Sequence, residues 1–530
     1  MQTAYRAADP MSQELATWHP APVSADTAMA SERIPIAGRL HDLVRNNGWA
    51  SQAVRRECEA VIGANLRLSY MPDFEALGLT LEWATEFKRE VQGRWRLYAN
   101  DPDFAADAAR QNSVPVLFAQ AYRHFVMDGE GIGAILQREG RTASRTILQI
   151  MHPLRLSNPA GVPESDGLRS GVEVDEYGAA HAYHFRDRHP YDAAAFSTAR
   201  QFSWTRIPRE TPWGRPNILH VFESEQAGQT RGISRLAALV EGLKTQDKYE
   251  RTEMQAAIVN AILAAYIESP MDTQLLMEGM NAEGLDQTGD GGLSGYQGLR
   301  DAFHDSARLT LGGVQLQHLF PGEKLGFHAA ARPAANYEPF VSSVLRKSAA
   351  ATGMSYEQVA GDWSKVNYSS ARASLLEVWR GLYARRHVFT QGFCTPFFGA
   401  WLEEEIAEGR LDHVLPKNAP SFWEAKAAYV RANWIGPARG WVDPDKESKA
   451  SGNRMRIGIS TFADEAAEQG KDPDEHRMAL AAERQQFAKD GLTHPMDMAE
   501  PVSGAADTST DDSRPGDATS GEPDSEESNQ

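Results

Sequence analysis

The stretch Gly361–Trp379, GDWSKVNYSSARASLLEVW, joins a polar loop to a helical run rich in Leu, Ala, Arg and Glu. Its loop carries one cation, Lys365, and the stretch holds no nucleophile with a neighbouring base. Gly361 lets the chain turn, and Ser369 or Ser370 is expected to cap the helix N-terminus through a side-chain oxygen. The stretch therefore predicts a loop mounted on a helix, and not a catalytic motif.

The helix behind this loop is expected to run from near Ser370 to about Glu408. At 1.5 Å per residue, about 39 residues give a length of roughly 58 Å. Pro396 removes a backbone donor and crowds the preceding turn, so a kink is expected nearby. The apolar stripe of this helix, interrupted at Arg386, consists of Leu375, Trp379, Leu382, Phe389, Phe393, Phe397 and Trp401.

Helical patterns recur elsewhere in the chain. Residues 42–62 look helical, and a second stretch repeats apolar residues every three or four positions. A helix from about Ile233 carries Asp247 and Arg251 at an i,i+4 spacing that can form an ion pair, and a shorter helix is expected over 336–352. The second stretch has its apolar residues at Leu81, Ala84, Phe87, Val91 and Trp95.

Strand patterns lie between these helices. The pattern of residues 171–186 predicts two short strands around a turn. Residues 218–222 (ILHVF) predict a compact apolar strand, and residues 309–320 also have strand character. Strands and helices mixed in this way predict an α+β fold that is mainly α.

Composition narrows the class of protein. The chain has 530 residues, more than a single hydrophobic core usually contains, so more than one substructure is expected. Cys58 and Cys394 are far apart and predict buried thiols in a reducing compartment, and not a disulfide framework. The N-terminus lacks a signal-peptide pattern. The longest apolar run, 256–267, is too short to span a membrane, so no membrane association is expected.

Acidic residues concentrate at the C-terminal end. From Asp497 to Gln530 there are ten acids and one base, a net charge of −9 and half of the total of −18. Residues 493–530 contain few apolar residues and are therefore expected to be a disordered tail. Removing this tail should not prevent the protein from assembling. The mild acidity of the rest argues against tight nucleic-acid binding. It does not exclude a protein that lets DNA pass without binding it tightly.

No motif supports an active site or a cofactor. The Gly-rich segment 289–298 lacks the Lys-Ser or Lys-Thr of a phosphate loop, and the dinucleotide pattern breaks at Ser294, so a surface loop is expected. His181 and His184 stand three apart in a strand and should point to opposite faces. Even with His189 they predict no metal site.

Several blocks, taken together, resemble the lambda-like family of phage portal proteins, which form the ring at one capsid vertex. They are HVFESEQAGQTRGISRLAALVEGLK (His220–Lys244), GMSYEQVAGDWSKVNYSSARASLLEVWR (Gly353–Arg380), WLEEEI (Trp401–Ile406), NWIG (Asn433–Gly436) and MRIGISTFADEAAEQGKDPDE (Met455–Glu475). The N-terminal arm and the acidic tail have no counterpart in the resemblance.

The resemblance implies a portal fold with a wing, a two-helix stem, a clip, a tunnel loop on a long kinked helix, and a crown. The implied segments are 1–36 extended N-terminal arm, 37–232 wing, 233–262 first stem helix, 263–335 clip, 336–353 second stem helix, 354–369 tunnel loop, 370–409 long kinked helix of the wing, 410–492 crown and 493–530 disordered acidic tail.

The resemblance also implies partners and a site. The ring would be dodecameric, pass double-stranded DNA without sequence specificity, and bind terminase, head completion or connector proteins, and the major capsid and scaffold proteins. It would be assembled in the host cytoplasm and reside in the virion. The apolar stripe, which looks too extensive for one subunit to cover, supports a ring. The residues expected to line the DNA channel are Asp362, Trp363, Ser364, Lys365, Asn367 and Tyr368.

Other classes of protein stay open at this point. A metal-dependent phage nuclease or another DNA-processing enzyme could build its site from scattered acids, although the missing phosphate loop counts against a packaging ATPase. A capsid component that forms no ring is a further alternative. A mass measurement would separate a ring from a monomer, and plasmid digestion with and without magnesium would reveal a nuclease.

Overall fold

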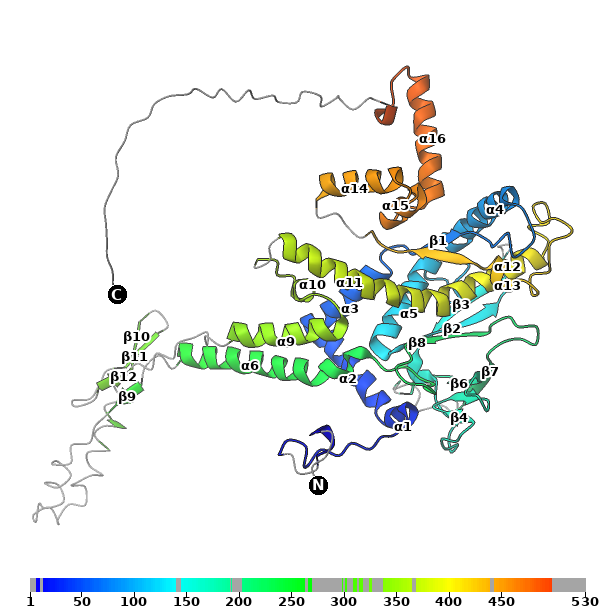
Figure 1. Cartoon of the computed structure of the whole chain (residues 1–530). Helices are drawn as coiled ribbons and strands as arrows, with labels where there is room; N and C mark the ends of the chain where they lie inside the picture. Colours follow the sequence, from blue (N-terminus) through cyan, green and yellow to red (C-terminus); the bar gives the residue numbers. More distant parts are fainter. Residues whose placement is uncertain are drawn as a thin grey trace, which may run out of the picture. The chain divides into compact units, whose positions relative to one another are not determined.

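The fold divides into two compact units, residues 1–472 and 473–530. Each unit is described by itself below, on the elements labelled in Figure 1. The computed structural model describes residues 6–9, 13–139, 144–190, 192, 203–262, 266–268, 298, 301–302, 308–311, 314–317, 324–326, 337–364, 368–438 and 443–497.

Five helices precede most of the strands in the first unit. In α4 the apolar spacing gives one buried face, because Ala84, Phe87, Val91 and Trp95 are all buried. The predicted helix and its core face are therefore confirmed except at Leu81, the first residue of the helix, which is 52% exposed. The five are α1 (Ala25–Ala30), α2 (Arg33–Asn46), α3 (Gly48–Val61), α4 (Leu81–Ala99) and α5 (Val114–Asp128).

The N-terminal region is more helical than the sequence suggested. The expectation of an extended arm over 1–36 is wrong beyond Ser24, which caps α1 by accepting the Thr27 N–H. Pro35 is tolerated in the first turn of α2, where an N–H would lack an intrahelical partner. The single helix expected over 42–62 is two helices, because Asn47 is extended and caps α3.

Two antiparallel sheets follow. The three-stranded sheet has the order β3-β2-β8, and the four-stranded sheet has the order β4-β5-β6-β7. The strands expected in 171–186 and at 218–222 are confirmed. The strands are β2 (Glu130–Gln137), β3 (Thr146–Met151), β8 (Ile218–Phe222), β4 (Leu168–Arg169), β5 (Val172–Val174), β6 (Ala180–Arg186) and β7 (Trp204–Pro208).

The long helix predicted from Ser370 to Glu408 exists, with an interruption. It comprises α11 (Tyr368–Phe389), a π-helical turn η6 (Thr390–Cys394) and α12 (Thr395–Ala407). The irregularity expected near Pro396 is therefore a π turn directly before it, as is common where the helical ladder is broken.

Most of the apolar stripe of this helix is buried within the subunit. Phe389, Phe393, Phe397 and Trp401 are fully buried, and Trp401 packs edge-on against Trp95 of α4 with ring centroids 5.1 Å apart. The expectation that this stripe is too extensive for one subunit to cover is therefore wrong from Leu382 to Trp401, where α4, α5 and the three-stranded sheet cover it. Leu375 and Trp379 are only partly buried.

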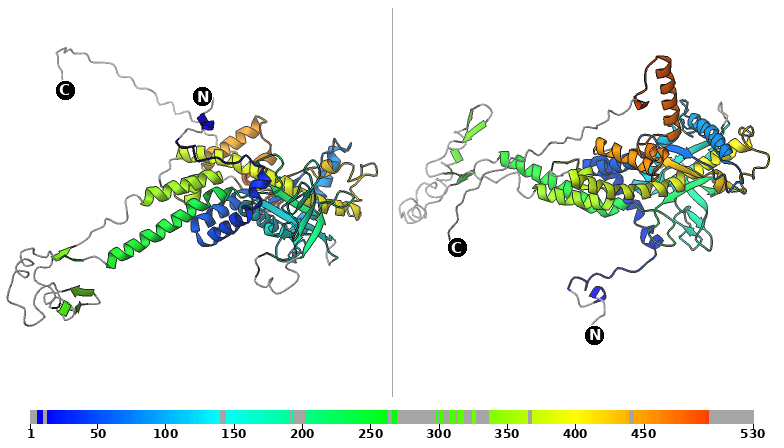
Figure 2. Two further views of the ribbon diagram at one scale, coloured as in Figure 1. Left: turned by 90° about the horizontal axis from the view of Figure 1, so that it is seen from below. Right: turned by 45° about the horizontal axis from the view of Figure 1, so that its top comes forward.

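A helix pair brackets the least regular part of the chain. The helix expected near Ile233 starts as a 3-10 turn, η5 (Arg235–Leu239), and continues as α6 (Val240–Ile262), and the second helix is α9 (Tyr337–Thr352). Figure 2 shows α6 and α9 side by side in both views. Tyr249 of α6 stacks on Tyr337 of α9 at 5.9 Å.

A further prediction from the sequence, an ion pair within α6, is confirmed. Asp247 and Arg251 form the predicted i,i+4 ion pair at 3.3 Å. Between the two helices, the strand character expected over 309–320 is confirmed for 309–311 and 314–317, which belong to two antiparallel strands, while 312–313 and 318–320 lie outside the described residues. The described strands there are β9 (Tyr266–Glu268), β10 (Arg308–Leu311), β11 (Val314–Gln317) and β12 (Lys324–Gly326). The Gly-rich segment 289–298 lies outside the described residues except for Gly298.

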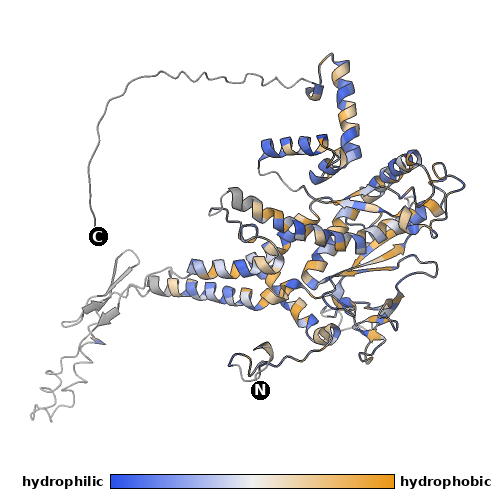
Figure 3. Cartoon of the chain, in the orientation of Figure 1, coloured by the Kyte–Doolittle hydropathy of each residue, from blue (hydrophilic) through white to orange (hydrophobic). Residues whose placement is uncertain are grey.

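The segment after α12 returns to the main core before becoming helical. β13 pairs antiparallel with β1, and Trp434 packs edge-on against Trp95 and Phe118. Figure 3 shows α14 as largely hydrophilic, and none of its residues is buried. The remaining elements of this unit are β1 (Arg67–Tyr70), α10 (Tyr356–Ala360), α13 (Lys426–Tyr429), β13 (Ala432–Ile435), α14 (Pro444–Arg456), α15 (Phe462–Glu468), η1 (Arg6–Ala8) and η2 (Pro153–Arg155).

The second unit contains α16 (Pro473–Lys489) and the short turn η7 (Pro495–Asp497). His494 packs edge-on against Phe487, with ring centroids 5.2 Å apart, and Arg484 pairs with Asp497 at 2.6 Å. The disorder expected from residue 493 is therefore wrong for 493–497, and the rest of the tail lies outside the described residues. Within the described part of the chain, no helix is both long and apolar enough to cross a membrane.

Candidate functional site

The segment expected to be a tunnel loop is built from helix caps. Gly353 ends α9 in the left-handed region, at φ +65°. In the SYEQ element, Ser355 accepts the Gln358 N–H and the Gln358 side chain accepts the Ser355 N–H, which starts α10 with a capping box. This part of the segment is therefore a short helix, and not a loop throughout.

α10 ends by the same logic. Gly361, at φ +67°, is its left-handed C-cap, so the turn predicted there is confirmed. Asp362 Oδ1 then accepts the N–H of Ser364 at 3.0 Å and its hydroxyl at 2.7 Å, which stabilises the turn locally. Trp363 between them is 48% exposed, so a flat ring faces outward from a fixed turn.

The structure places only part of the predicted channel set. Asp362, Trp363 and Ser364 share one turn, while Lys365 and Asn367 lie outside the described residues. Tyr368 is the first residue of α11. Ser369 and Ser370 therefore lie inside the helix, and the expectation that one of them is its N-cap is wrong.

A small apolar cluster fixes the base of this segment. Met354 and Val359 pack with Ala53 of α3 and with Leu345 and Ala349 of α9. The caps set the local path of the chain, and this cluster attaches the path to two helices of the body.

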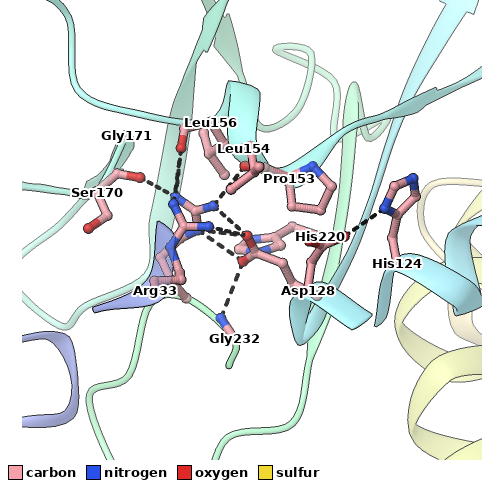
Figure 4. Close-up of polar contacts among 12 residues, drawn as sticks. Arg33, His124, Asp128, Pro153, Leu154, Leu156, Ser170, Gly171, His220 and Gly232 are labelled. Carbon is pink, nitrogen blue, oxygen red and sulfur yellow. Dashed lines mark hydrogen bonds and ion pairs between the residues drawn. The ribbon is translucent and has the colours of Figure 1, made fainter. Parts of the chain in front are cut away.

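A second motif of the sequence, GQTRG at 228–232, lies deep in the protein. Arg231 is buried, and its guanidinium forms an ion pair with the fully buried Glu130 at the start of β2. Arg231 Nε also donates to Glu130 Oε2 at 2.9 Å, and Nη1 donates to the Leu156 carbonyl at 2.9 Å. Figure 4 shows the surrounding backbone acceptors, Pro153, Leu156 and Ser170.

Further donors complete the shell of Glu130. Arg33 Nη1 lies 3.2 Å from Oε1, His220 Nε2 lies 2.9 Å from Oε2, and the Gly232 N–H donates at 3.2 Å. Burial alone raises the pKa of Glu130, but the charge and hydrogen bonds of Arg231 outweigh it and hold the pKa well below its usual range. Burial lowers the pKa of His220.

Two glycines let the backbone close around this network. A Cβ on Gly129, at φ +84°, would lie 2.2 Å from the Ile233 carbonyl carbon, and a Cβ on Gly232 would lie 2.1 Å from the Gly129 carbonyl oxygen. No larger residue fits either position without moving backbone. The GQTRG loop is thus a structural clamp that sets where η5 and α6 begin.

A histidine cluster lies beside the clamp. Asp128, the last residue of α5, accepts from His41 Nε2 at 2.9 Å and contacts His124 Nδ1 at 2.7 Å. Burial alone raises the pKa of Asp128, but the hydrogen bonds from His124 and His41 outweigh it and bring the pKa to about 2. The His152 ring lies 4.9 Å from that of His124 and 4.8 Å from that of His189.

The other histidine pair corrects the sequence reading. His181 Nε2 and His184 Nε2 contact the two oxygens of one carboxylate, Glu173, at 3.0 and 2.6 Å. A register shift between β5 and β6 at Glu173 and Val174 breaks the alternation of faces, so the expectation of opposite faces is wrong. Arg206 also pairs with Glu173, and this cation makes a metal ion unfavourable there.

Comparison with known proteins agrees with this architecture. The profile described as phage portal protein, lambda family, matches residues 11–386. A curated relative, the portal protein of Escherichia phage N15, is 35% identical over 485 residues, covering 91% of this chain and 90% of the relative. The chain belongs to the lambda family of phage portal proteins. Portal protein B of Escherichia phage lambda is 33% identical and covers 87% of this chain and 85% of its own.

Solved structures include distant likenesses. A chain from the virion of a native gene transfer agent particle matches with 12% identity, a TM-score of 0.41, and coverage of 83% of this chain and 94% of that chain. A chain from the neck of a native particle of this kind matches with 14% identity, a TM-score of 0.40, and coverage of 82% and 90%. Family membership makes this protein a structural capsid component and not an enzyme.

Sequence reasoning missed the residues that the fold gathers most tightly. His41, Asp128 and His152 come from distant parts of the chain and show no ligand spacing. One part of the cluster could have been found from the sequence. His124 and Asp128 stand at i,i+4 on α5, a spacing at which two side chains can pair. Arg231 could not be recognised as buried from a polar loop sequence.

Proposed function

We propose that twelve copies of this chain close into a ring at one capsid vertex, through which double-stranded DNA is packaged and later ejected. The observation that carries this proposal is the match to the two curated portal proteins, which extends over about nine-tenths of each chain. A match of that extent supports the whole-protein function and not a shared domain alone.

We assign the ring's segments from the family resemblance, which the order of the elements supports. α6 and α9 act as stem helices, and residues 263–335 between them form the clip, which docks terminase during packaging and head completion or connector proteins afterwards. Residues 37–232 and 370–409 form the wing and 410–492 the crown. The antiparallel pairing of α6 and α9, with Tyr249 against Tyr337 and Phe340, supports a stem that carries a protruding module.

The tunnel loop, residues 354–369, faces the channel in this arrangement. The exposed Trp363 offers a flat face to DNA or to the neighbouring loop. Lys365, repeated around the ring, provides a sparse belt of cations whose contacts with phosphates are weak and screened by salt. Such contacts let DNA slide without being gripped.

Subunit contacts need apolar surface that one chain leaves uncovered. Leu376 and Tyr383, seven residues apart on one face of α11, are 40% and 41% exposed. We assign this face to the neighbouring subunit, since heterologous contacts that close under rotation generate rings. The major capsid and scaffold proteins bind the outside of the ring, which assembles in the host cytoplasm and remains in the virion.

Cryo-electron microscopy of the purified full-length protein tests this proposal. A closed ring with residues 354–369 at its inner wall and α11 between subunits is expected. A ring whose inner wall is formed by other segments would contradict the loop assignment and leave the ring itself intact. Leu376→Asp with Tyr383→Asp should reduce ring formation, whereas Leu97→Asp, on an exposed position of α4, should not.

A further inference from the structure

The histidine cluster beside the clamp has the composition of a metal site. The side chain of Asp128 is 1% exposed, and its carboxylate faces imidazoles from α2 and α5 and lies near a third that precedes η2. Donor atoms of His41, Asp128 and His152 all lie within 4.8 Å of one another. We propose that these three residues bind one Zn²⁺ ion, which ties α2 to α5 and to the segment after β3.

The distances require only a small adjustment. In a tetrahedral zinc site with bonds of about 2.0–2.1 Å, neighbouring donors are roughly 3.3 Å apart. His41 Nε2 and Asp128 Oδ1 are already 2.9 Å apart, so the main movement is a rotation of His152 toward them. The His152 Nδ1 accepts the Leu154 N–H at 3.2 Å, and the ring gives up this long hydrogen bond when it binds the metal.

An outer shell of the expected kind is present. His124 Nδ1 lies 2.7 Å from Asp128 Oδ2, so it holds the carboxylate while Oδ1 turns to the ion. Partners of this kind orient metal-binding carboxylates and histidines. Imidazole and carboxylate together suit zinc better than calcium or magnesium, which prefer oxygen ligands.

The site has an entrance. A surface hollow is lined by His41, His152 and His189, together with Ile34, Pro35, Gly38, Arg45 and Leu154. It can admit the ion and supply water as a fourth ligand, with the His189 ring 4.8 Å from His152 as an alternative. Arg45 also lines this hollow, but its Nε donates to the His41 carbonyl oxygen at 3.1 Å, so its guanidinium is bonded to the backbone of its own helix.

The Glu173 cluster provides a comparison within the same chain. Two imidazoles converge there as well, but Arg206 donates to both Glu173 oxygens, at 2.9 and 2.6 Å. A guanidinium that occupies the carboxylate leaves no place for a metal cation. Asp128 is hydrogen-bonded by imidazoles instead. Unlike a guanidinium, an imidazole can give up its proton or its hydrogen bond and bind a metal ion through the same nitrogen.

The test uses metal-stripped full-length protein titrated with Zn²⁺ and, separately, with Co²⁺. We expect one ion per chain and a visible Co²⁺ absorption of tetrahedral type. His152→Asn and His41→Asn should each weaken binding by about 10-fold to 100-fold. His181→Asn, in the Glu173 cluster, is the matched control and should bind as the wild type does.

A second readout avoids dependence on variant folding. In wild-type protein, Zn²⁺ should protect His41 and His152 from acylation by diethylpyrocarbonate, read by peptide mass spectrometry, and should leave His181 reactive. Absence of Zn²⁺ binding by the wild type, unchanged binding in His152→Asn, or equal modification with and without Zn²⁺ would overturn the proposal and leave a hydrogen-bonded cluster.

Discussion

The GQTRG clamp at 228–232 and the segment from Gly353 to Ser364 both lie in the blocks that resemble portal proteins, yet they are held in different ways. The clamp joins residues about a hundred positions apart through buried ion pairs, such as Arg231 with Glu130 and Arg33 with Glu130. In the loop segment the polar groups form hydrogen bonds that span two or three positions, and the apolar contacts of Met354 and Val359 attach it to α3 and α9.

This difference shows that two motifs shared with the same family can have different roles, one structural and one in surface contacts. Arg231 is a charged residue in a polar loop, but its buried ion pair with Glu130 ties the loop before η5 and α6 to the start of β2. Trp363 is an apolar residue of the kind expected in a core, but it is exposed on a fixed turn. Long-range buried contacts indicate a structural role, and local caps that leave side chains free indicate a surface for contact.

The largest expected effect comes from filling the space at Gly129. Gly129→Ala places a Cβ against the Ile233 backbone, and we expect a loss of about 4 kcal/mol or more in the free energy of unfolding. Gly361→Ala is the matched control, since it has a similar φ but its nearest neighbour is Gln52 Nε2 at 3.5 Å. It should cost about 1–2 kcal/mol. Similar losses in denaturant titrations would contradict the contrast.

Removing the charge of Glu130 is the next test. Glu130→Gln leaves Arg231 and Arg33 buried without their carboxylate and should cost roughly 3–5 kcal/mol in the free energy of unfolding. Because the pKa of Glu130 is held well below 4.5, its stabilisation is present above pH 4.5 and is lost as the pH falls through the lower folded value. The two stability curves should therefore converge in acid.

The control for this variant is Glu59→Gln, which removes an exposed i,i+3 partner of Arg56 and should cost at most about 1 kcal/mol. A cost at Glu130 as small as that at Glu59 would show that the buried network does not stabilise the fold.

A smaller effect is expected in the loop segment. Ser355→Ala removes the cap of α10 and should cost about 1 kcal/mol, measured by chemical denaturation. Ser364→Ala, whose hydroxyl bonds only within an exposed turn, should change stability by less than about 0.5 kcal/mol. A loss of several kcal/mol at Ser355 would contradict a purely local role of the cap and would mean that it also supports the apolar contacts of Met354 and Val359.

The smallest expected effect on stability belongs to Lys365. Lys365→Ala should leave ring assembly and unfolding unchanged but reduce the DNA packaged or retained in the head, and Lys365→Glu should reduce it further. Lys417→Ala, at an exposed position after α12, is the control. Normal amounts of full-length DNA in both Lys365 variants would remove this residue from the channel while leaving the portal family unaffected.

Much of the fold was predictable because local periodicity governs it. The stripe on α4 follows from apolar residues every three or four positions, and the strand at 218–222 from a compact apolar run. Pro396 predicted an irregularity in the long helix. What escaped depends on contacts between distant residues. Asn47 divides one apparent helix by capping α3, and a register shift at Glu173 brings His181 and His184 to one carboxylate.

The candidate site was only partly predictable for the same reason. Gly361 and the SYEQ cap could be read from neighbouring residues, so the turn was expected. Arg386 looked like a break in the apolar stripe, but it is buried and caps α3 by donating to the Val61 carbonyl at 2.7 Å. Three elements must pack together before His41, Asp128 and His152 come close to one another. The spacing of these residues in the sequence does not predict this.

The central claim is that this chain forms the portal ring, and native mass spectrometry of the full-length protein at micromolar concentration tests it most directly. A single dominant assembly with the mass of twelve chains is the predicted result. A spectrum containing only monomers under conditions in which the protein is folded would contradict the account.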